Sequence, residues 1–211
     1  MRQGFIEHRT ATINRIRGLL AEFGIVLPLK AATVRREAAA CLEDLPGWAN
    51  VAIGDALSEL YRLDERIEQY DRHIAQMAKE DTRARQLMKL CGIGETTASA
   101  IVAMVGNGHE FSCGRQFAAW LGLTPGQYSS GGKSRLGRIT KAGDSYLRSL
   151  LVLGARAVLN AAANKTDRVS TWAKALAERR GYWRAVIAIA AKNARMAWAV
   201  LRRGDAFEVL S

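Results

Sequence analysis

Three features of this sequence predict a mainly α-helical fold. Long stretches are rich in Ala, Leu, Arg and Glu, which are strong helix formers. Apolar residues recur at intervals of three and four, and the β-branched alternation that is typical of strands is rare. Only three prolines, Pro28, Pro46 and Pro125, interrupt the 211 residues. We therefore expect N-terminal helices that include a long coiled-coil-like helix, followed by a second helical domain.

The first 84 residues are expected to form helices separated by Pro28 and Pro46. The expected spans are 6–23, 31–42 and 49–78. In the last of these, apolar residues step by threes and fours, and Asp64 interrupts the apolar seam. This heptad-like spacing fits either a coiled-coil arm for dimerisation or an amphipathic helix that packs within its own domain. Segment 1–84 is thus interpreted as a dimerisation or linker segment.

Positive charge is concentrated in residues 85–211. Residues 1–84 hold 12 Lys and Arg against 13 Asp and Glu, whereas residues 85–211 hold 19 against 7. A surplus on one part of a chain indicates a polyanionic partner for that part. We expect residues 85–211 to form a helical domain that binds nucleic-acid phosphates; a protein that is merely basic is the alternative.

Other patterns exclude several classes of protein. No apolar run reaches 18 residues and no N-terminal signal pattern is present, so a membrane is not an expected partner. Cys41, Cys91 and Cys113 are far apart and odd in number, and the three histidines are equally scattered. This excludes a disulfide framework and a classical metal motif, and it predicts a reducing, cytoplasmic setting.

A helix-hairpin-helix is predicted around Gly92-Ile93-Gly94. A short helix over residues 86–90 is expected before the turn, and small and apolar residues follow it. The glycines permit a tight turn, and Ile93 is expected to fill the space between the two helices. Gly94 leaves the free N–H groups of the next helix open to a phosphate, which they would hold without reading sequence. A plain corner between two helices is the alternative.

A basic loop rich in glycine and serine is predicted between Gly122 and Gly143. Small residues let a backbone approach phosphates closely, and cations neutralise them. The candidate phosphate-binding cations here and on the following helix are Lys133, Arg135, Arg138, Lys141 and Arg148.

The same loop is not a nucleotide-hydrolysis site. Gly132-Lys133-Ser134 resembles the end of a nucleotide-binding loop, but Gln127 stands where the first glycine is required, and no strand is expected before the loop. A serine nucleophile would need help with deprotonation and charge neutralisation. From chemistry alone, a loop that merely grips the nucleic-acid backbone is favoured.

Several runs taken together resemble one family. They are Gly92-Ile93-Gly94, residues 115–125, residues 128–133, residues 141–144 with Leu147 and Arg148, residues 14–20, and residues 191–201. The combination resembles the insertion-sequence 110 family of transposases, the DEDD-type serine transposases guided by a bridge RNA. The resemblance covers nearly the whole chain.

This resemblance implies a role in DNA transposition and recombination. In the family, an N-terminal RuvC-like domain binds magnesium through four acidic residues, and a C-terminal domain carries a serine that bonds covalently to DNA. A coiled coil between them takes part in dimerisation. By position the implied nucleophile is Ser130, with Ser129 and Ser134 as weaker candidates. The implied partners are DNA, a guide RNA and a second copy of the chain.

The sequence departs from the family at its start. It has no opening strand with the expected Ile-Asp-x-x-Lys-like signature, and the acids after residue 84 are scattered. We therefore expect a truncated transposase that lacks the RuvC-like domain, binds no magnesium or other cofactor itself, and is inactive alone. The alternative is a non-catalytic module that binds nucleic acid or dimerises.

Aromatic residues near the C-terminus lie beside arginines. Trp172, Tyr182 and Trp183 flank Arg179, Arg180 and Arg184. Such aromatics either stack on bases or ribose or anchor helix packing, and packing is the favoured role for the two tryptophans. The final helix is expected over residues 183–203.

Overall fold

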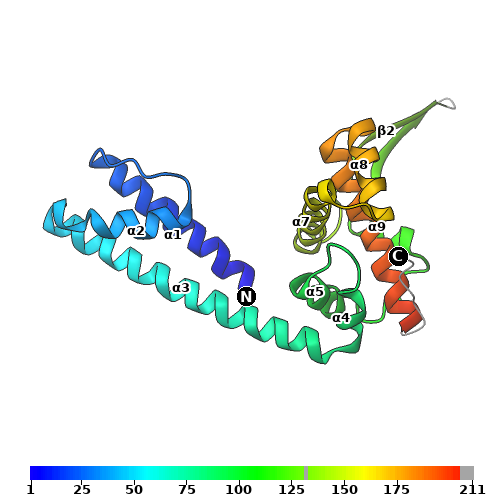
Figure 1. Cartoon of the computed structure of the whole chain (residues 1–211), viewed down its shortest axis with the longest axis horizontal. Helices are drawn as coiled ribbons and strands as arrows, with labels where there is room; N and C mark the ends of the chain where they lie inside the picture. Colours follow the sequence, from blue (N-terminus) through cyan, green and yellow to red (C-terminus); the bar gives the residue numbers. More distant parts are fainter. Residues whose placement is uncertain (131–132, 205–211) are drawn as a thin grey trace. The chain divides into compact units, whose positions relative to one another are not determined.

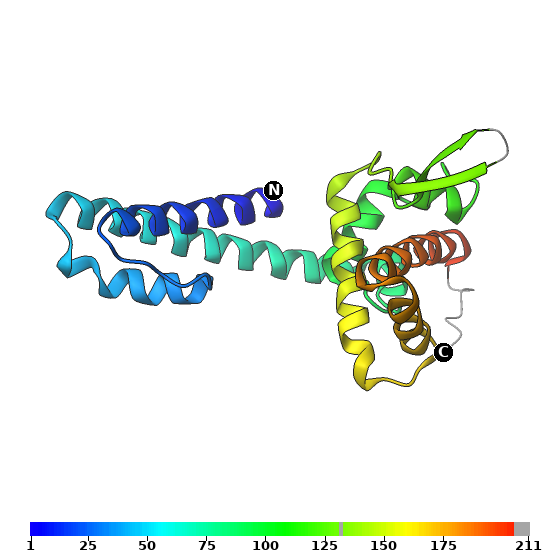
Figure 2. The same ribbon diagram turned by 90° about the horizontal axis from the view of Figure 1, so that it is seen from above.

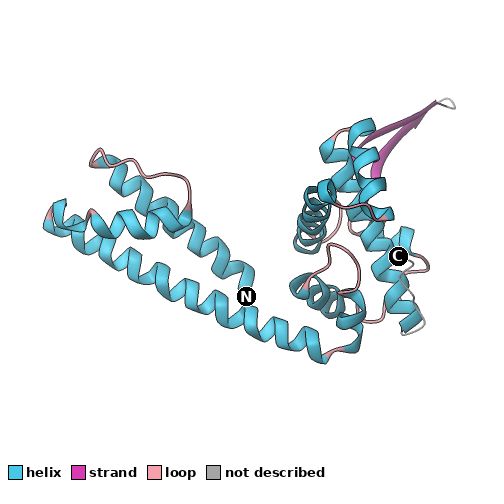
Figure 3. Cartoon of the chain, in the orientation of Figure 1, coloured by secondary structure: helices cyan, strands magenta, loops and turns pink. Residues whose placement is uncertain are grey.

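The computed structural model describes residues 1–130 and 133–204, without the side chains of residues 129–134. In this part of the chain nine α-helices accompany one two-stranded sheet, so the mainly α fold is confirmed (Figure 3). The chain divides into two compact units, Met1–His73 and Ile74–Ser211. The change of composition at residue 85 lies inside the second unit. None of the described helices is long and apolar enough to cross a bilayer.

The first unit is built on one long helix. Its elements are α1 (Arg2–Glu22), α2 (Ala31–Ala40), the short 3-10 turn η1 (Leu42–Asp44) and the part of α3 (Gly47–Glu80) that ends at His73. Both α1 and α2 lie along α3 (Figures 1 and 2). The seam residues Ile53, Leu57 and Leu60 are buried in one cluster with Ile16 of α1 and Val34 of α2. This part of the apolar seam therefore packs within its own unit.

Asp64, which interrupts the apolar seam, is an electrostatic link between all three helices. One carboxylate oxygen accepts a hydrogen bond from Arg9 of α1 at 3.2 Å, and the other accepts one from Nε of Arg35 of α2 at 2.7 Å. All three side chains are less than one third exposed. Because this polar seam residue pairs with one arginine from each of α1 and α2, it links both helices to α3.

The second unit surrounds a single apolar core. Its helices are α4 (Thr82–Leu87), α5 (Glu95–Val105), α6 (Gly114–Trp120), α7 (Ser145–Ala161), α8 (Arg168–Arg180) and α9 (Tyr182–Arg203), with the short turn η2 (Ala162–Asn164) after α7. The core is lined by one face of α9, including Val186, Ile189 and Ala197, and by residues from each of the other α-helices. The long helix α9 contacts α4, α6, α7 and α8.

Part of the expected glycine-serine loop is a β-hairpin. Strands β1 (Pro125–Ser130) and β2 (Lys133–Ile139) pair antiparallel and extend away from the helices (Figures 1 and 2). The expectation that no strand precedes Gly131 was therefore wrong. Described hairpin side chains are mostly exposed on both faces, so the apolar-polar alternation that announces a half-buried strand is missing. Gly131 and Gly132 lie outside the described residues.

We predict that Asp64→Asn loosens the first unit. The substitution leaves Arg9 and Arg35 facing an uncharged group, so the free energy of local unfolding should fall by about 1–2 kcal/mol, between the values for exposed and buried pairs. Amide hydrogen exchange in α1 measures this change. The matched control is Glu68→Gln, whose ion pair with Arg72 is largely exposed and should matter by under about 0.5 kcal/mol. Equal effects of the two substitutions would contradict the role of Asp64 as a link between α1, α2 and α3.

Candidate nucleic-acid interface

The described cations from residue 85 onward have no acidic partners. Among described residues from 85 onward, no Lys or Arg lies within 4.0 Å of a carboxylate oxygen, whereas residues 1–83 contain seven such pairs. A surplus of cations without internal partners raises the positive potential of this unit and attracts polyanions.

Two acids after residue 84 serve as helix caps. The Asp144 carboxylate accepts a hydrogen bond from the backbone N–H of Leu147 at 2.6 Å at the start of α7. Asp167 does the same for Val169 and Ser170 at the start of α8. Hydrogen bonds from the Ser170 side chain and backbone hold the pKa of Asp167 below its usual value. These carboxylates stabilise helix ends and leave the cations unneutralised.

The described acids do not fit the magnesium-binding set that the resemblance implies. No three His, Cys, Asp or Glu side chains come together as metal ligands anywhere in the described part of the chain. No catalytic step is therefore assigned to a metal bound by these residues.

The turn between α4 and α5 is held against α7 by glycines. The preceding helix is α4 at Thr82–Leu87, somewhat earlier than the expected 86–90. Gly92 has φ +86°, and a Cβ built on it would lie 2.8 Å from the carbonyl oxygen of Gly154. A Cβ on Gly154 would lie 1.9 Å from the Gly92 oxygen. The two backbones touch, so neither position has room for a side chain.

Two further residues complete this turn. Ile93 is 4% exposed and joins the core. The buried Asn193 of α9 donates from Nδ2 to the carbonyl oxygen of Cys91 at 2.9 Å. Gly94 is the N-cap of α5, with nothing within 4 Å of a built Cβ, so the first N–H groups of α5 lie beside an open position. Gly92 and Ile93 thus face protein, and Gly94 faces open space.

A shallow groove of about 540 Å³ runs between this turn and α7. It is lined by residues 88–94, Thr97, Leu150, Leu153, Gly154 and Ala157. The open start of α5 therefore lies at a concave surface.

The base of the β-hairpin is a tightly closed crossing. Gly122 has φ +69°, and its built Cβ would lie 2.4 Å from the backbone nitrogen of Ala142. Gly143 packs on the end of α6, where a Cβ would lie 1.7 Å from the carbonyl oxygen of Trp120. Lys141 is exposed and has φ +55°, and its N–H donates to the Gly122 oxygen. Both ends of the glycine-rich segment are therefore fixed.

Arg148 braces the same crossing. Its Nη1 donates to the carbonyl oxygens of Leu121 at 3.1 Å and Gly143 at 3.0 Å. This side chain therefore positions the hairpin on α7, and sequence reasoning, which assigned it to phosphate binding, missed this contact.

The register of the hairpin sets which residues stand opposite each other. Tyr128 pairs with Arg135, and Ser130 pairs with Lys133. Gln127 pairs with Leu136. The side chains of Ser130 and Lys133 lie outside the described residues, whereas those of Tyr128 and Arg135 are exposed.

The remaining candidates are exposed. Arg138 on β2 is open to solvent, like Arg135. The Tyr128 ring covers Gly137, where a built Cβ would lie 3.0 Å from the ring. The hairpin thus presents cations and an aromatic ring on a narrow projecting ribbon.

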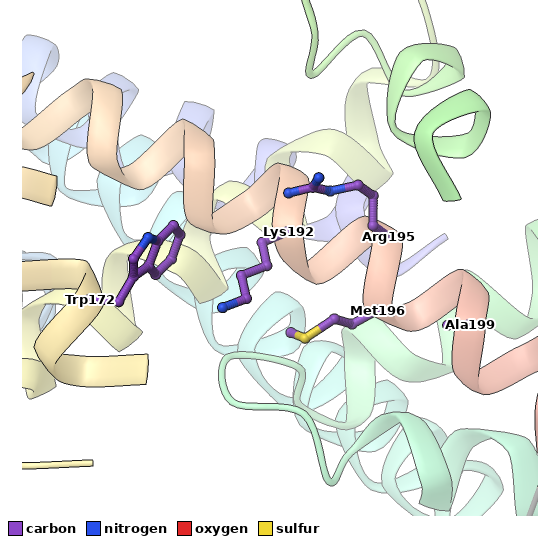
Figure 4. Close-up of a pocket in the computed structure, with 5 residues that line it drawn as sticks. All are labelled: Trp172, Lys192, Arg195, Met196 and Ala199. Carbon is purple, nitrogen blue, oxygen red and sulfur yellow. The ribbon is translucent and has the colours of Figure 1, made fainter. Parts of the chain in front are cut away.

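The two C-terminal tryptophans differ in environment. Trp172 packs against the core, and Nζ of Lys192 lies 4.4 Å from its ring centroid. Figure 4 shows the Lys192 side chain reaching toward the indole, within a shallow surface pocket of about 470 Å³. Trp183 is 61% exposed. The expectation that both anchor packing holds for Trp172 and fails for Trp183, because Trp183 lies in the exposed first turn of α9.

Comparison of the sequence with known proteins finds one matching family and several similar relatives. Residues 84–170 match the family described as "Transposase IS116/IS110/IS902 family". The chain is similar to insertion-sequence transposases. It is 44% identical to a "Probable family 20 transposase" of Pseudomonas aeruginosa across 96% of its own length and 62% of that relative. It is 40% identical to the "Transposase for insertion sequence element IS1111A" of Coxiella burnetii, covering 98% of the chain and 58% of the relative.

A third relative agrees with these two. The chain is 34% identical to the "Transposase for insertion sequence element IS1328" of Yersinia enterocolitica, across 98% of its own length and 62% of that protein. The chain thus spans about three fifths of these curated relatives. The family match covers the α4–α5 turn, the hairpin and α7, which are the elements that carry most of the candidate residues.

We predict that Gly154→Ala disrupts the turn at Gly92. The added methyl group meets the Gly92 carbonyl, so local stability should fall by about 1–3 kcal/mol although alanine favours a helix. Gly18→Ala in α1 is the matched control, because its built Cβ meets nothing within 4 Å and the substitution should stabilise by about 0.5–1 kcal/mol. Hydrogen exchange in α7 and α1 measures both. The same sign for both substitutions would contradict the close approach.

Proposed function

We propose that this chain is the DNA-binding part of an insertion-sequence transposase, acting in DNA transposition, and that its β-hairpin carries the serine nucleophile. The observation that carries this proposal is the hairpin register, in which Ser130 stands opposite Lys133 and, two positions along, Tyr128 stands opposite Arg135. The similarity to transposases over nearly the whole chain supports it.

Serine chemistry at this position is consistent with the charge around it. Attack by the Ser130 hydroxyl on a phosphodiester forms a new P–O bond and breaks a bridging one. The leaving oxygen takes up a proton, and the serine gives one up. Negative charge that develops on the phosphate is neutralised by nearby cations, which are Lys133 and Arg135 in this proposal.

The register also distinguishes Ser130 from its neighbours. In this register Ser129 stands opposite the uncharged Ser134, whereas Ser130 stands opposite Lys133. This supports Ser130 as the nucleophile over the other two.

In the same proposal, the backbone of the DNA is held at further points. The open start of α5 after Gly94 takes one phosphate in the manner of a helix-hairpin-helix, and Arg138 and Lys141 take others. Arg148 acts indirectly, by bracing the hairpin. A guide RNA and a second copy of the chain are further partners that the family resemblance suggests. The magnesium-binding carboxylates belong to a part of the transposase outside these residues.

We predict a covalent adduct that depends on Ser130. The chain is mixed with magnesium, labelled insertion-sequence-end DNA, and the part of the Pseudomonas aeruginosa relative that the match leaves uncovered. A DNA–protein band should then survive on a denaturing gel. Ser130→Ala should abolish this band, because the attacking hydroxyl is gone, whereas Ser129→Ala and Ser134→Ala should keep it.

Three other outcomes would change or contradict this proposal. An adduct that survives Ser130→Ala would move the nucleophile elsewhere. Binding without any adduct from the unmutated chain would favour a non-catalytic binding module. Magnesium-dependent cleavage by this chain alone would contradict the proposal that the magnesium-binding carboxylates belong to another part of the transposase.

A further inference from the structure

The start of α9 carries an exposed aromatic pair that the proposed function does not use. Trp183 is 61% exposed and Tyr182 is 38% exposed, although both are large and partly apolar. Their ring centroids are 5.3 Å apart at an interplanar angle of 86°. An edge-to-face pair of this kind fixes the orientation of the rings at little entropic cost.

Contacts from α7 hold both rings in place. The Arg156 guanidinium carbon lies 5.5 Å from the Trp183 ring centroid. The Tyr182 hydroxyl donates to Oδ1 of Asn160 at 3.0 Å. Because Arg156 and Asn160 are four residues apart, they share one face of α7. The rings are thus oriented by α7 while much of their surface stays open to solvent.

The surroundings of this pair are cationic. Arg179 and Arg180 end α8, Arg184 follows Trp183, and all three are exposed. None of the three, nor Arg156, has a carboxylate partner within 4.0 Å among the described residues. The only acid among residues 168–204 is Glu178.

An exposed, pre-oriented ring amid unpaired arginines matches one class of partner. Single-stranded nucleic acid presents open base faces that stack on aromatic rings, and its phosphates bind the surrounding cations. Duplex nucleic acid keeps its base faces stacked internally and offers only groove edges and phosphates.

The location on α7 also favours a strand. Leu153, three residues before Arg156, is 55% exposed and lines the groove beside the α4–α5 turn. One face of α7 therefore leads from that groove, through Leu153, to the ring pair. A single strand on this face would meet the open start of α5 at one end and the aromatic rings at the other.

We propose that Trp183, oriented by Arg156 and Tyr182, is a base-stacking platform for single-stranded nucleic acid, with Arg179, Arg180 and Arg184 as phosphate contacts. This site goes beyond the hairpin and its chemistry. Trp172 is not part of it, because the Lys192 ammonium lies over its ring and the ring packs on the core.

Binding of short oligonucleotides to the whole chain tests the platform. The probes are fluorescein-labelled (dT)12, the equivalent uridine 12-mer, and a 12-base-pair DNA duplex, followed by anisotropy. Trp183→Ala should weaken single-strand binding at least about fivefold, the lower range for one stacked base, and change duplex affinity less than about twofold. Trp183→Phe should keep most of the affinity, because the phenyl ring still stacks.

Matched variants keep this test separate from the proposed function. Trp48→Ala removes a tryptophan of similar exposure (69%) from the first unit and should change neither affinity. Arg135→Gln with Arg138→Gln should weaken duplex binding more than single-strand binding. If duplex binding is absent but the effect of Trp183→Ala remains, the hairpin proposal fails and the platform stands.

Other results would overturn the platform. Equal losses on single strand and duplex with Trp183→Ala would reduce Trp183 to a general electrostatic or folding role. Unchanged single-strand affinity, or no single-strand binding by the unmutated chain, would remove the site. A difference between the thymidine and uridine probes identifies which kind of strand the platform prefers.

Discussion

The imbalance of charge in the second unit governs its properties. Residues 85–211 carry 19 Lys and Arg against 7 Asp and Glu, and Asp144 and Asp167 cap helices instead of pairing with cations. Like charges on a compact body repel each other, so binding an anion lowers the electrostatic repulsion within the fold. The first unit is the opposite case, since six of its ten Lys and Arg pair with its own acids. The chain thus joins a unit with mostly paired cations to a stretch whose described cations are unpaired.

Close backbone contacts at glycines and hydrogen bonds to carbonyls hold the second unit together. Gly92 and Gly154 bring a turn and a helix to backbone contact, and Gly122 and Gly143 close the base of the hairpin. Arg148 and Asn193 then fix these segments by donating to backbone carbonyls. The groups proposed to meet nucleic acid are therefore carried on a rigid frame, which lowers the ordering cost of binding.

The helices were predictable because their signal is local. Periodic apolar residues and flanking Gly or Pro placed α1, α2, α3 and α9 within a few residues of their observed bounds. The β-hairpin was missed because its strands are rich in Gly and Ser and are exposed on both faces, so no alternation marks them. The α4–α5 turn was recognised from its glycines, although only the structure shows that Gly92 faces Gly154.

Roles that depend on distant partners could not be predicted. Arg148 was expected to bind phosphate, but its reach to the Leu121 and Gly143 carbonyls depends on how α7 meets the end of α6. The contact of Asn193 could not be predicted, because its partner Cys91 is 102 positions away. Trp172 packs on the core and Trp183 does not, because helix packing, which is not encoded locally, decides which helix turns face the core. The sequence shows Asp64 as an interruption of the apolar seam, and its pairing with Arg9 and Arg35 explains why an acid stands there.

Unpaired cations after residue 84 are proposed to bind nucleic-acid phosphates. The salt dependence of affinity tests it most directly, because each neutralised phosphate releases condensed counterions. Affinity of the chain for a DNA duplex should be measured between about 50 and 200 mM salt. A slope of log K against log salt near about −4.5 or steeper, which corresponds to about five or more phosphates, is the predicted result. A flat response would contradict the account.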